Sequence, residues 1–125
     1  MKLIITSFAI FFSAYLNAQT AKYKLDTNEV DFGDIPCGEI VSKKIKITNT
    51  SDKEIYPGDL LFTIKYPGFN GIILPNTIKP GLSDYIIILC RNRSSNPSNA
   101  KEFEAYMINE RDGVTVKLKG LRQCG

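Results

Sequence analysis

The chain of 125 residues contains no histidine, no tryptophan and only three cysteines. Without histidine, neither a Ser-His nor a Cys-His nucleophile can form, and the imidazole ligands that usually hold zinc or copper are missing. Without tryptophan, the Cys…Trp…Cys pattern of antibody domains is excluded as well. The glycines are spaced like turns rather than like a phosphate-binding loop. These absences favour a protein that is not an enzyme and binds no cofactor.

Residues 1–18, MKLIITSFAIFFSAYLNA, have the layout of a cleavable secretory signal, with Lys2 as the only charge and the small Ala18 at the end. Ser7, Ser13 and Asn17 interrupt the apolar run, whereas a bilayer-spanning helix needs about 20 apolar residues, so retention as an anchor is the weaker alternative. We therefore expect export to the periplasm or the extracellular space, with no stable membrane span after cleavage.

The rest of the chain is long enough for a single domain that buries its own core. Residues 19–28 are expected to lead into a domain that covers residues 29–125. Without Lys2 the formal net charge of +3 becomes about +2. That balance alone predicts neither a nucleic-acid partner nor a membrane partner.

Apolar residues recur with a period of two, and clusters of Gly, Asn, Asp and Pro separate the apolar segments. Each such segment is typical of a half-buried antiparallel strand, as in residues 41–49, where Lys44 and Lys46 alternate with Ile45 and Ile47. Lys43 falls on the apolar side and is expected near a sheet end or at a bulge. About seven strands are predicted, at residues 29–32, 40–49, 60–66, 72–78, 84–90, 102–109 and 114–121. The fold class is therefore all-β, a two-sheet immunoglobulin-like sandwich preceded by the signal-peptide helix.

Residues 84–90, DYIIILC, are apolar on both faces of the predicted strand. If Tyr85, Ile87 and Leu89 fill the core, then Ile86 and Ile88 lie on the outer face and form a candidate interaction surface. The alternative is that residues 21–25 fold over Ile86 and Ile88.

The stretch VDFGDIPCGEIVSKKIKITNTSD, followed by IKPG at residues 78–81 and VTVKLKG at residues 114–120, resembles the Hydin-type (ASH) immunoglobulin-like family. That family is similar in fold to major sperm protein and to a domain of unknown function in secreted bacterial proteins. Many of those bacterial members carry a Cys-Gly-Cys-Thr segment after the third strand, where this chain has KYPGFNG. Any role of that segment is therefore not carried over.

The residues that carry the resemblance have structural roles in their own right. Phe32 is expected to place its ring in the core, while Gly33 and Gly38 allow a tight path into the next strand. Asn49 can close the following turn through side-chain hydrogen bonds, and Pro80 with Gly81 suits the centre of a type II turn.

On an immunoglobulin-like path, Cys37, Cys90 and Cys124 all lie at the same end of the sandwich. In an exported chain two of them should form a disulfide. The first strand of such domains often lies parallel to the last, so Cys37 with Cys124 is the preferred pair and Cys90 stays a buried free thiol. Cys37 with Cys90 is the second choice, and a three-thiolate metal site is a further alternative.

Several other patterns have plain structural readings. Glu102 and Glu104 share one strand face and are expected to be solvated rather than catalytic. The basic residues Lys43, Lys44 and Lys46 belong to a different predicted sheet from Lys117, Lys119 and Arg122, so no single nucleic-acid patch is expected. The glycosylation patterns at residues 49–51 and 92–94 are expected to be unmodified, because the resemblance is to bacterial proteins.

Three functions remain open. The leading one is a non-catalytic secreted or periplasmic interaction or structural module with an unidentified protein or glycan partner. The second is a periplasmic chaperone-like protein that binds clients by edge-strand addition. The third is a thiol-based metal or redox protein that uses the cysteines.

Overall fold

The computed structural model describes residues 22–65, 69–92 and 101–123. The predicted signal peptide and Cys124 lie outside the described residues. The strands are β1 (Tyr23–Leu25), β2 (Glu29–Ile35), β3 (Ile40–Asn49), β4 (Thr63–Ile64), β5 (Phe69–Ile73), β6 (Ser83–Arg91), β7 (Lys101–Asn109) and β8 (Val114–Arg122). A single turn of 3₁₀ helix, η1 (Pro57–Asp59), precedes β4. Within these ranges, none of the helices reaches the length and hydropathy that crossing a bilayer requires.

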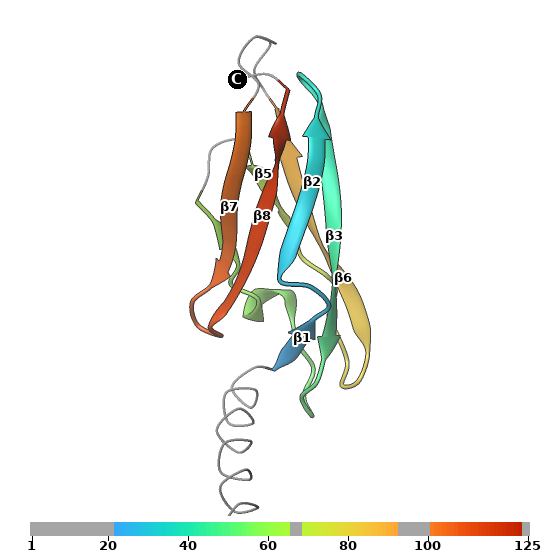
Figure 1. Ribbon diagram of the computed structural model, residues 1–125. Helices are drawn as coiled ribbons and strands as arrows, with labels where there is room; N and C mark the ends of the chain where they lie inside the picture. Colours follow the sequence, from blue (N-terminus) through green and yellow to red (C-terminus); the bar gives the residue numbers. More distant parts are fainter. Residues whose placement is uncertain (1–21, 66–68, 93–100, 124–125) are drawn as a thin grey trace, which may run out of the picture.

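The strands form two sheets that pack face to face as an immunoglobulin-like sandwich (Figure 1). Sheet A has the order β1-β3-β6-β5, and sheet B has the order β2-β8-β7-β4. Neighbouring strands are antiparallel except β2 and β8, which run parallel. The chain therefore starts the sandwich in sheet A and closes it in sheet B, where its first long strand lies beside its last.

The core lies between the two sheets and is filled by alternate residues of the long strands. Ile45 and Ile47 from β3 enter it, as do Met107 from β7 and Val116 with Leu118 from β8, all with no exposed surface. Their neighbours along each strand point to solvent, because successive side chains of a strand alternate between faces. The predicted strand at residues 40–49 matches β3 residue for residue.

The predicted orientation of the strand at residues 84–90 is wrong. Ile86 and Ile88 are fully buried in the core, whereas Tyr85 is 42% exposed on the outer face of sheet A. The two faces of the strand are exchanged relative to the prediction, because β6 packs against sheet B through its even-numbered residues. The last of these is the buried Cys90. Ile86 and Ile88 are therefore not an interaction surface. Nor does the lead-in segment cover the outer face, since β1 pairs with the edge of β3.

The predicted strand at residues 60–66 is reduced to Thr63–Ile64. Pro57 and Gly58 start the 3₁₀ turn instead, and its end is fixed by the Leu60 N–H, which donates to the Pro57 carbonyl at 3.1 Å. Leu60 is buried in the core, although its backbone joins no sheet. The alternation of apolar residues here therefore marks an extended connecting segment with buried side chains, not a paired strand.

The predicted strand at residues 72–78 also differs from the structure. β5 ends at Ile73, and Ile78 pairs with Ile55 in an isolated bridge through hydrogen bonds of 2.8 and 2.9 Å. Pro75 lies between the two, and a proline cannot donate a ladder hydrogen bond. Both Ile55 and Ile78 are buried, so this bridge contributes both side chains to the core.

Two turns show why the motif residues suit their positions. Gly33 has a φ of 63° at the point where the β2–β8 register shifts between Asp31 and Asp34, as expected of a glycine in a bulge. Gly81 has a φ of 78°, and the Leu82 N–H donates to the Lys79 carbonyl at 3.0 Å, which is the geometry of a type II turn. This turn leads the chain into β6.

Candidate interaction surface

The outer face of sheet A carries an exposed apolar strip. It consists of Tyr85, Ile87 and Leu89 from β6 and Ile73 from β5, which we call the β6 strip. Tyr85 and Ile73 are 42% and 49% exposed, and Ile87 and Leu89 are partly exposed. In the register Ile73 lies opposite Ile87, and Gly71 lies opposite Leu89. The four apolar side chains are thus contiguous and face away from the core.

Basic side chains border the β6 strip on the side of β3. Lys46 lies opposite Tyr85 and Lys44 lies opposite Ile87 in the register of β3 and β6. The Lys44 ammonium is placed over the Tyr85 ring, 4.5 Å from its centre, in a cation–π contact. Lys24 from β1 and Arg91 at the end of β6 also point outward by strand alternation.

Charge on the strands of this face has one sign, although the Asp26 carboxylate, just after β1, accepts from the Lys46 N–H at 3.0 Å on the same border. The outward positions of β1, β3, β5 and β6 hold Lys24, Lys44, Lys46 and Arg91, and none of them holds a carboxylate. The Thr48 and Ser83 hydroxyls, both on this face, form a hydrogen bond with each other at 2.7 Å. The face is therefore apolar in the middle and basic along one border.

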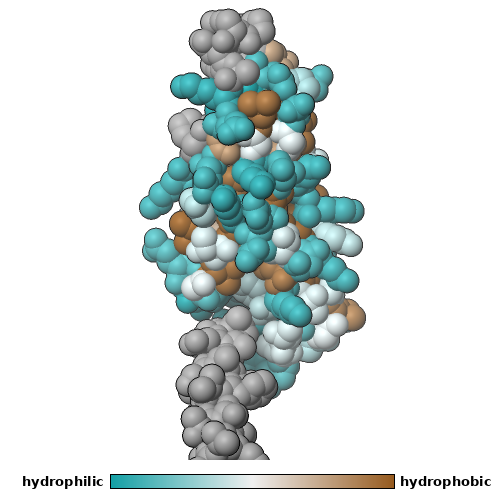
Figure 2. All heavy atoms as spheres, in the orientation of Figure 1, coloured by the Kyte–Doolittle hydropathy of each residue, from teal (hydrophilic) through white to brown (hydrophobic). Residues whose placement is uncertain are grey.

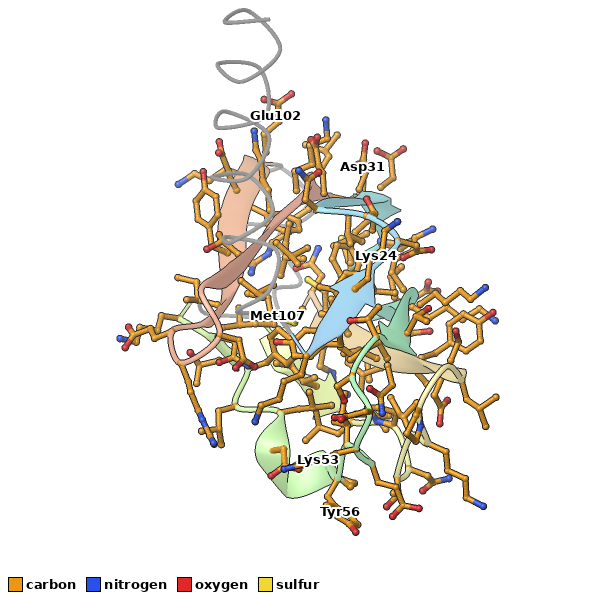
Figure 3. The ribbon with its side chains drawn as sticks, turned by 90° about the horizontal axis from the view of Figure 1, so that it is seen from below. Lys24, Asp31, Lys53, Tyr56, Glu102 and Met107 are labelled. Carbon is orange, nitrogen blue, oxygen red and sulfur yellow. The ribbon has the colours of Figure 1, made fainter. Side chains whose placement is uncertain are left out.

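The outer face of sheet B has the opposite character. Glu29, Asp31 and Asp34 line β2, and Glu102 and Glu104 line β7, with Lys117 and Lys119 of β8 between them. Hydrophilic side chains cover most of the middle of this face (Figure 2). Asp31 and Glu102 lie on the same side of the molecule, while Met107 lies between the layers (Figure 3). The two faces of the sandwich thus differ in both charge and polarity.

Glu102 and Glu104, the carboxylate pair noted in the sequence, belong to this polar ladder. Lys117 pairs with Glu104 at 3.3 Å, and Lys119 pairs with Glu29 at 2.9 Å. The hydrogen bond from the Tyr106 hydroxyl at 2.6 Å and the neighbouring Lys117 lower the pKa of Glu104. A carboxylate held in its ionised form cannot donate a proton at neutral pH, so Glu104 is unsuited to be a general acid.

A shallow depression on this face lies where β8 carries Gly120. A Cβ atom built at Gly120 would lie 2.8 Å from the Phe103 Cε1 and 3.1 Å from the Gly33 carbonyl oxygen. The Phe103 ring therefore occupies the volume that a side chain would need, and it also contacts Arg122, whose guanidinium carbon lies 5.3 Å from the ring centre. Gly120 is a packing requirement rather than a ligand site.

We expect Gly120→Ala to lower the free energy of unfolding by about 1–3 kcal/mol, because the added methyl overpacks the Phe103 ring. Gly58→Ala is the matched control, since a Cβ there meets no atom within 4 Å. The measurement is urea denaturation followed by far-ultraviolet circular dichroism. If both variants lose the same stability, the clash at Phe103 does not exist in solution.

Near Cys37, backbone hydrogen bonds join residues at or just after the end of β2 to residues that follow β6 and β8. The Gly38 N–H donates to the Asn92 carbonyl at 2.7 Å, and the Gln123 N–H donates to the Ile35 carbonyl at 3.0 Å. Cys90 is a free thiol without exposed surface, and burial raises its pKa, against the effect of the nearby Arg122. Cys37 is not a free thiol. Because Cys124 lies outside the described residues, the pairing of Cys37 with Cys124 stays a prediction.

Among the described residues, no group of three or more histidine, cysteine, aspartate or glutamate side chains is placed to hold a metal ion. Both glycosylation patterns place their asparagine inside the protein. Asn49 has no exposed surface and Asn92 is 2% exposed. The Asn92 side-chain amide donates to the Ile35 carbonyl at 3.1 Å. In the folded protein neither amide is accessible for modification.

The open sheet edges are short or carry charge. β4 pairs only with Ile108 and Met107, so along residues 101–106 the described part of the chain offers β7 no second neighbour. On β3, β1 covers only Ile47–Asn49. Lys43, in register opposite Ile88 with no bulge, is exposed on this open half of β3. A lysine on an open edge strand discourages pairing with another chain.

The residues of the β6 strip were not assigned to the surface from the sequence. Ser83 and Arg91, the polar ends of β6, have the same parity as Tyr85, Ile87 and Leu89. Polar ends on one parity indicate that this parity faces solvent, and that signal gives the correct orientation.

Comparison with known proteins supports the fold only. No protein-family model matches the chain, and no curated protein matches it. A crystal structure of a protein of unknown function from Porphyromonas gingivalis W83 is similar, with a TM-score of 0.54, 19% identity, and coverage of 78% of this chain and 45% of that one. The chain thus spans less than half of that protein. At this identity the similarity establishes a shared sandwich architecture.

Two further solved structures overlap more loosely. The structure of the Vibrio cholerae VesB protease matches with a TM-score of 0.47 and 14% identity, over 90% of this chain and 35% of that one. The ASH/PapD-like domain 7 of human CEP192 matches with a TM-score of 0.44 and 8% identity, over 83% and 85%.

Proposed function

We propose that the protein is a non-catalytic, exported interaction module that contacts a protein or glycan partner through the outer face of sheet A. The observation that carries the proposal is the β6 strip, a contiguous set of exposed and partly exposed apolar side chains on the outer face of sheet A. Contiguous apolar patches on soluble domains often mark interaction sites. The absence of histidine and the ion-paired carboxylates of sheet B support a role without catalysis.

Affinity capture from the exported fraction of the source cells, run with matched variants, tests this function. Ile73→Ser with Ile87→Ser removes apolar surface from the β6 strip, and Tyr106→Ser changes sheet B at a residue of similar exposure, 44%. The proposal expects a partner that wild type and Tyr106→Ser both retain and that the double variant loses. A partner retained equally by all three proteins would place the contact elsewhere.

We propose further that export is accompanied by a disulfide between Cys37 and Cys124. The signal-like residues 1–18, the free and buried Cys90, and the backbone contact between the ends of β2 and β8 support this pairing. The intact mass of the secreted protein, alkylated before reduction, should correspond to loss of residues 1–18, one disulfide and one alkylatable thiol after denaturation. Three alkylated thiols would contradict the disulfide and favour the thiol-based metal or redox alternative, whereas a retained signal would contradict export.

One observation favours the chaperone-like alternative, in which a client strand adds to an open edge. Residues 101–106 of β7 have a strand neighbour only on the side of β8 within the described ranges. Strand addition there would use backbone hydrogen bonds and be insensitive to side chains of the β6 strip. Suppression of client aggregation by wild type, and its loss in a Tyr106→Pro variant, would support this alternative.

The motifs VDFGDIPCGEIV and IKPG also lead us to propose that the chain is a divergent member of the Hydin-type (ASH) family. The two-sheet sandwich is compatible with that assignment.

A further inference from the structure

We propose that the partner presents an apolar strip with carboxylates along one border, and that those carboxylates pair with the lysines beside the β6 strip. This inference rests on the proposed function, because it names the chemistry of the surface that the same face would bind. It is drawn from the arrangement of apolar and charged side chains on sheet A.

The first element of recognition is the shape of the apolar centre. Tyr85, Ile87 and Leu89 stand two residues apart on one strand, and Ile73 lies beside Ile87 on the next. Their spacing follows the strand repeat of about 3.3 Å per residue and the separation of about 4.8 Å between strands. Such a surface suits a strand or sheet face with apolar residues at alternate positions.

The second element is a one-sided basic border. Lys24, Lys46 and Lys44 follow the β1 and β3 side of the strip, whereas the other side ends at β5, the edge strand of sheet A. The Lys44 ammonium is already held over the Tyr85 ring, which places positive charge directly beside the apolar centre. An apolar core with a charged rim is the common anatomy of protein interfaces. Carboxylates along one border would match this rim.

A second copy of the chain fits this face less well. Pairing two sheet A faces would bring together two predominantly basic surfaces, because the outward positions of β1, β3, β5 and β6 hold Lys24, Lys44, Lys46 and Arg91 and no carboxylate. The sheet B face is acidic, but Glu29 and Glu104 already pair with Lys119 and Lys117, and hydrophilic side chains cover most of its middle. Binding there would bury charged groups against Ile87 and Leu89 and break existing ion pairs, which costs free energy. A different protein with its own apolar strip is the better match.

The test is a selection of random displayed peptides on the wild-type protein, in parallel with Lys44→Glu/Lys46→Glu and with Ile73→Ser/Ile87→Ser. The exposed lysines can be changed without disturbing the core, and circular dichroism checks that each variant folds. We expect wild type to enrich peptides that combine apolar and acidic residues. Affinity for such a peptide should fall at least about tenfold in the lysine variant, since reversing two charges replaces attraction by repulsion. Lys117→Glu, on sheet B, should leave it unchanged.

The outcomes separate this inference from the proposed function. Peptides without acidic residues, whose binding is lost only in the isoleucine variant, would overturn the inference and leave the function intact. Peptides bound equally by wild type and both variants would overturn both. Failure to enrich any acidic, lysine-dependent peptide overturns the inference.

Two further measurements test whether a second copy of the chain or a lipid surface binds this face instead. Sedimentation of the protein alone that shows self-association, lost in the lysine variant, would make the partner a second copy. Lysine-dependent binding to phosphatidylglycerol vesicles would make it a lipid surface. Either result overturns the proposal of a carboxylate-bordered protein.

Discussion

Ile88→Ala should lower the free energy of unfolding by about 2–5 kcal/mol, because it leaves a cavity in the centre of the core. Ile88 has no exposed surface and lies between Lys43 of β3 and Ile72 of β5 in the register of sheet A. Ile87→Ala, one residue away, should cost at most about 1 kcal/mol, since Ile87 faces outward and loses mainly strand propensity. The two substitutions are chemically identical, so their difference isolates the orientation of β6.

The measurement is urea denaturation of both variants, followed by far-ultraviolet circular dichroism because the chain has no tryptophan. A larger loss for Ile87→Ala than for Ile88→Ala would mean that β6 has the opposite orientation. The β6 strip would then be part of the core.

Asn49→Ala should destabilise the fold by about 2–4 kcal/mol, because it removes four hydrogen bonds made by one fully buried side chain. Asn49 is fully buried at the end of β3. Its amide donates to the Lys53 carbonyl at 2.7 Å and to the Ile78 carbonyl at 2.8 Å, and its oxygen accepts from the Ser51 N–H at 2.9 Å and hydroxyl at 2.7 Å. One side chain thus joins β3, the following turn and the bridge at Ile78.

Thermal and urea unfolding of Asn49→Ala, Ser51→Ala and Asn28→Ala measure this contribution. Ser51→Ala removes only the hydroxyl and should cost about 1 kcal/mol. Asn28 is exposed, so its replacement should change stability by less than about 0.5 kcal/mol. Equal losses at Asn49 and Asn28 would show that the buried network contributes nothing.

The sequence predicted the long strands better than the short ones for a physical reason. In β3, polar and apolar residues alternate over most of its length, so period and phase are both readable. In β6 both faces are apolar. The composition therefore predicts a strand, but which face points inward depends on packing against sheet B. β1 and β4 have three and two residues, which are too few for periodicity, and they exist because they pair with β3 and β7.

The sequence predicted that an apolar surface strip exists, but it did not predict which residues form it. An outward apolar stripe on the strand at residues 84–90 followed from its composition, whereas the assignment to Ile86 and Ile88 was wrong. The basic border needed the strand register, because Lys44 and Lys46 adjoin Tyr85 and Ile87 only once β3 is known to pair with β6. The charge difference between the two faces likewise depends on which strands share a sheet.

Tyr85 and Tyr106 offer the most direct test of the claim that sheet A makes the contacts. They are 42% and 44% exposed and lie on opposite faces of the sandwich. The measurement is photocrosslinking in the source cells with benzoylphenylalanine in place of one tyrosine or the other. The account predicts a discrete crosslinked partner from position 85 and none from position 106. A partner crosslinked from position 106 alone, or from neither position, would contradict it.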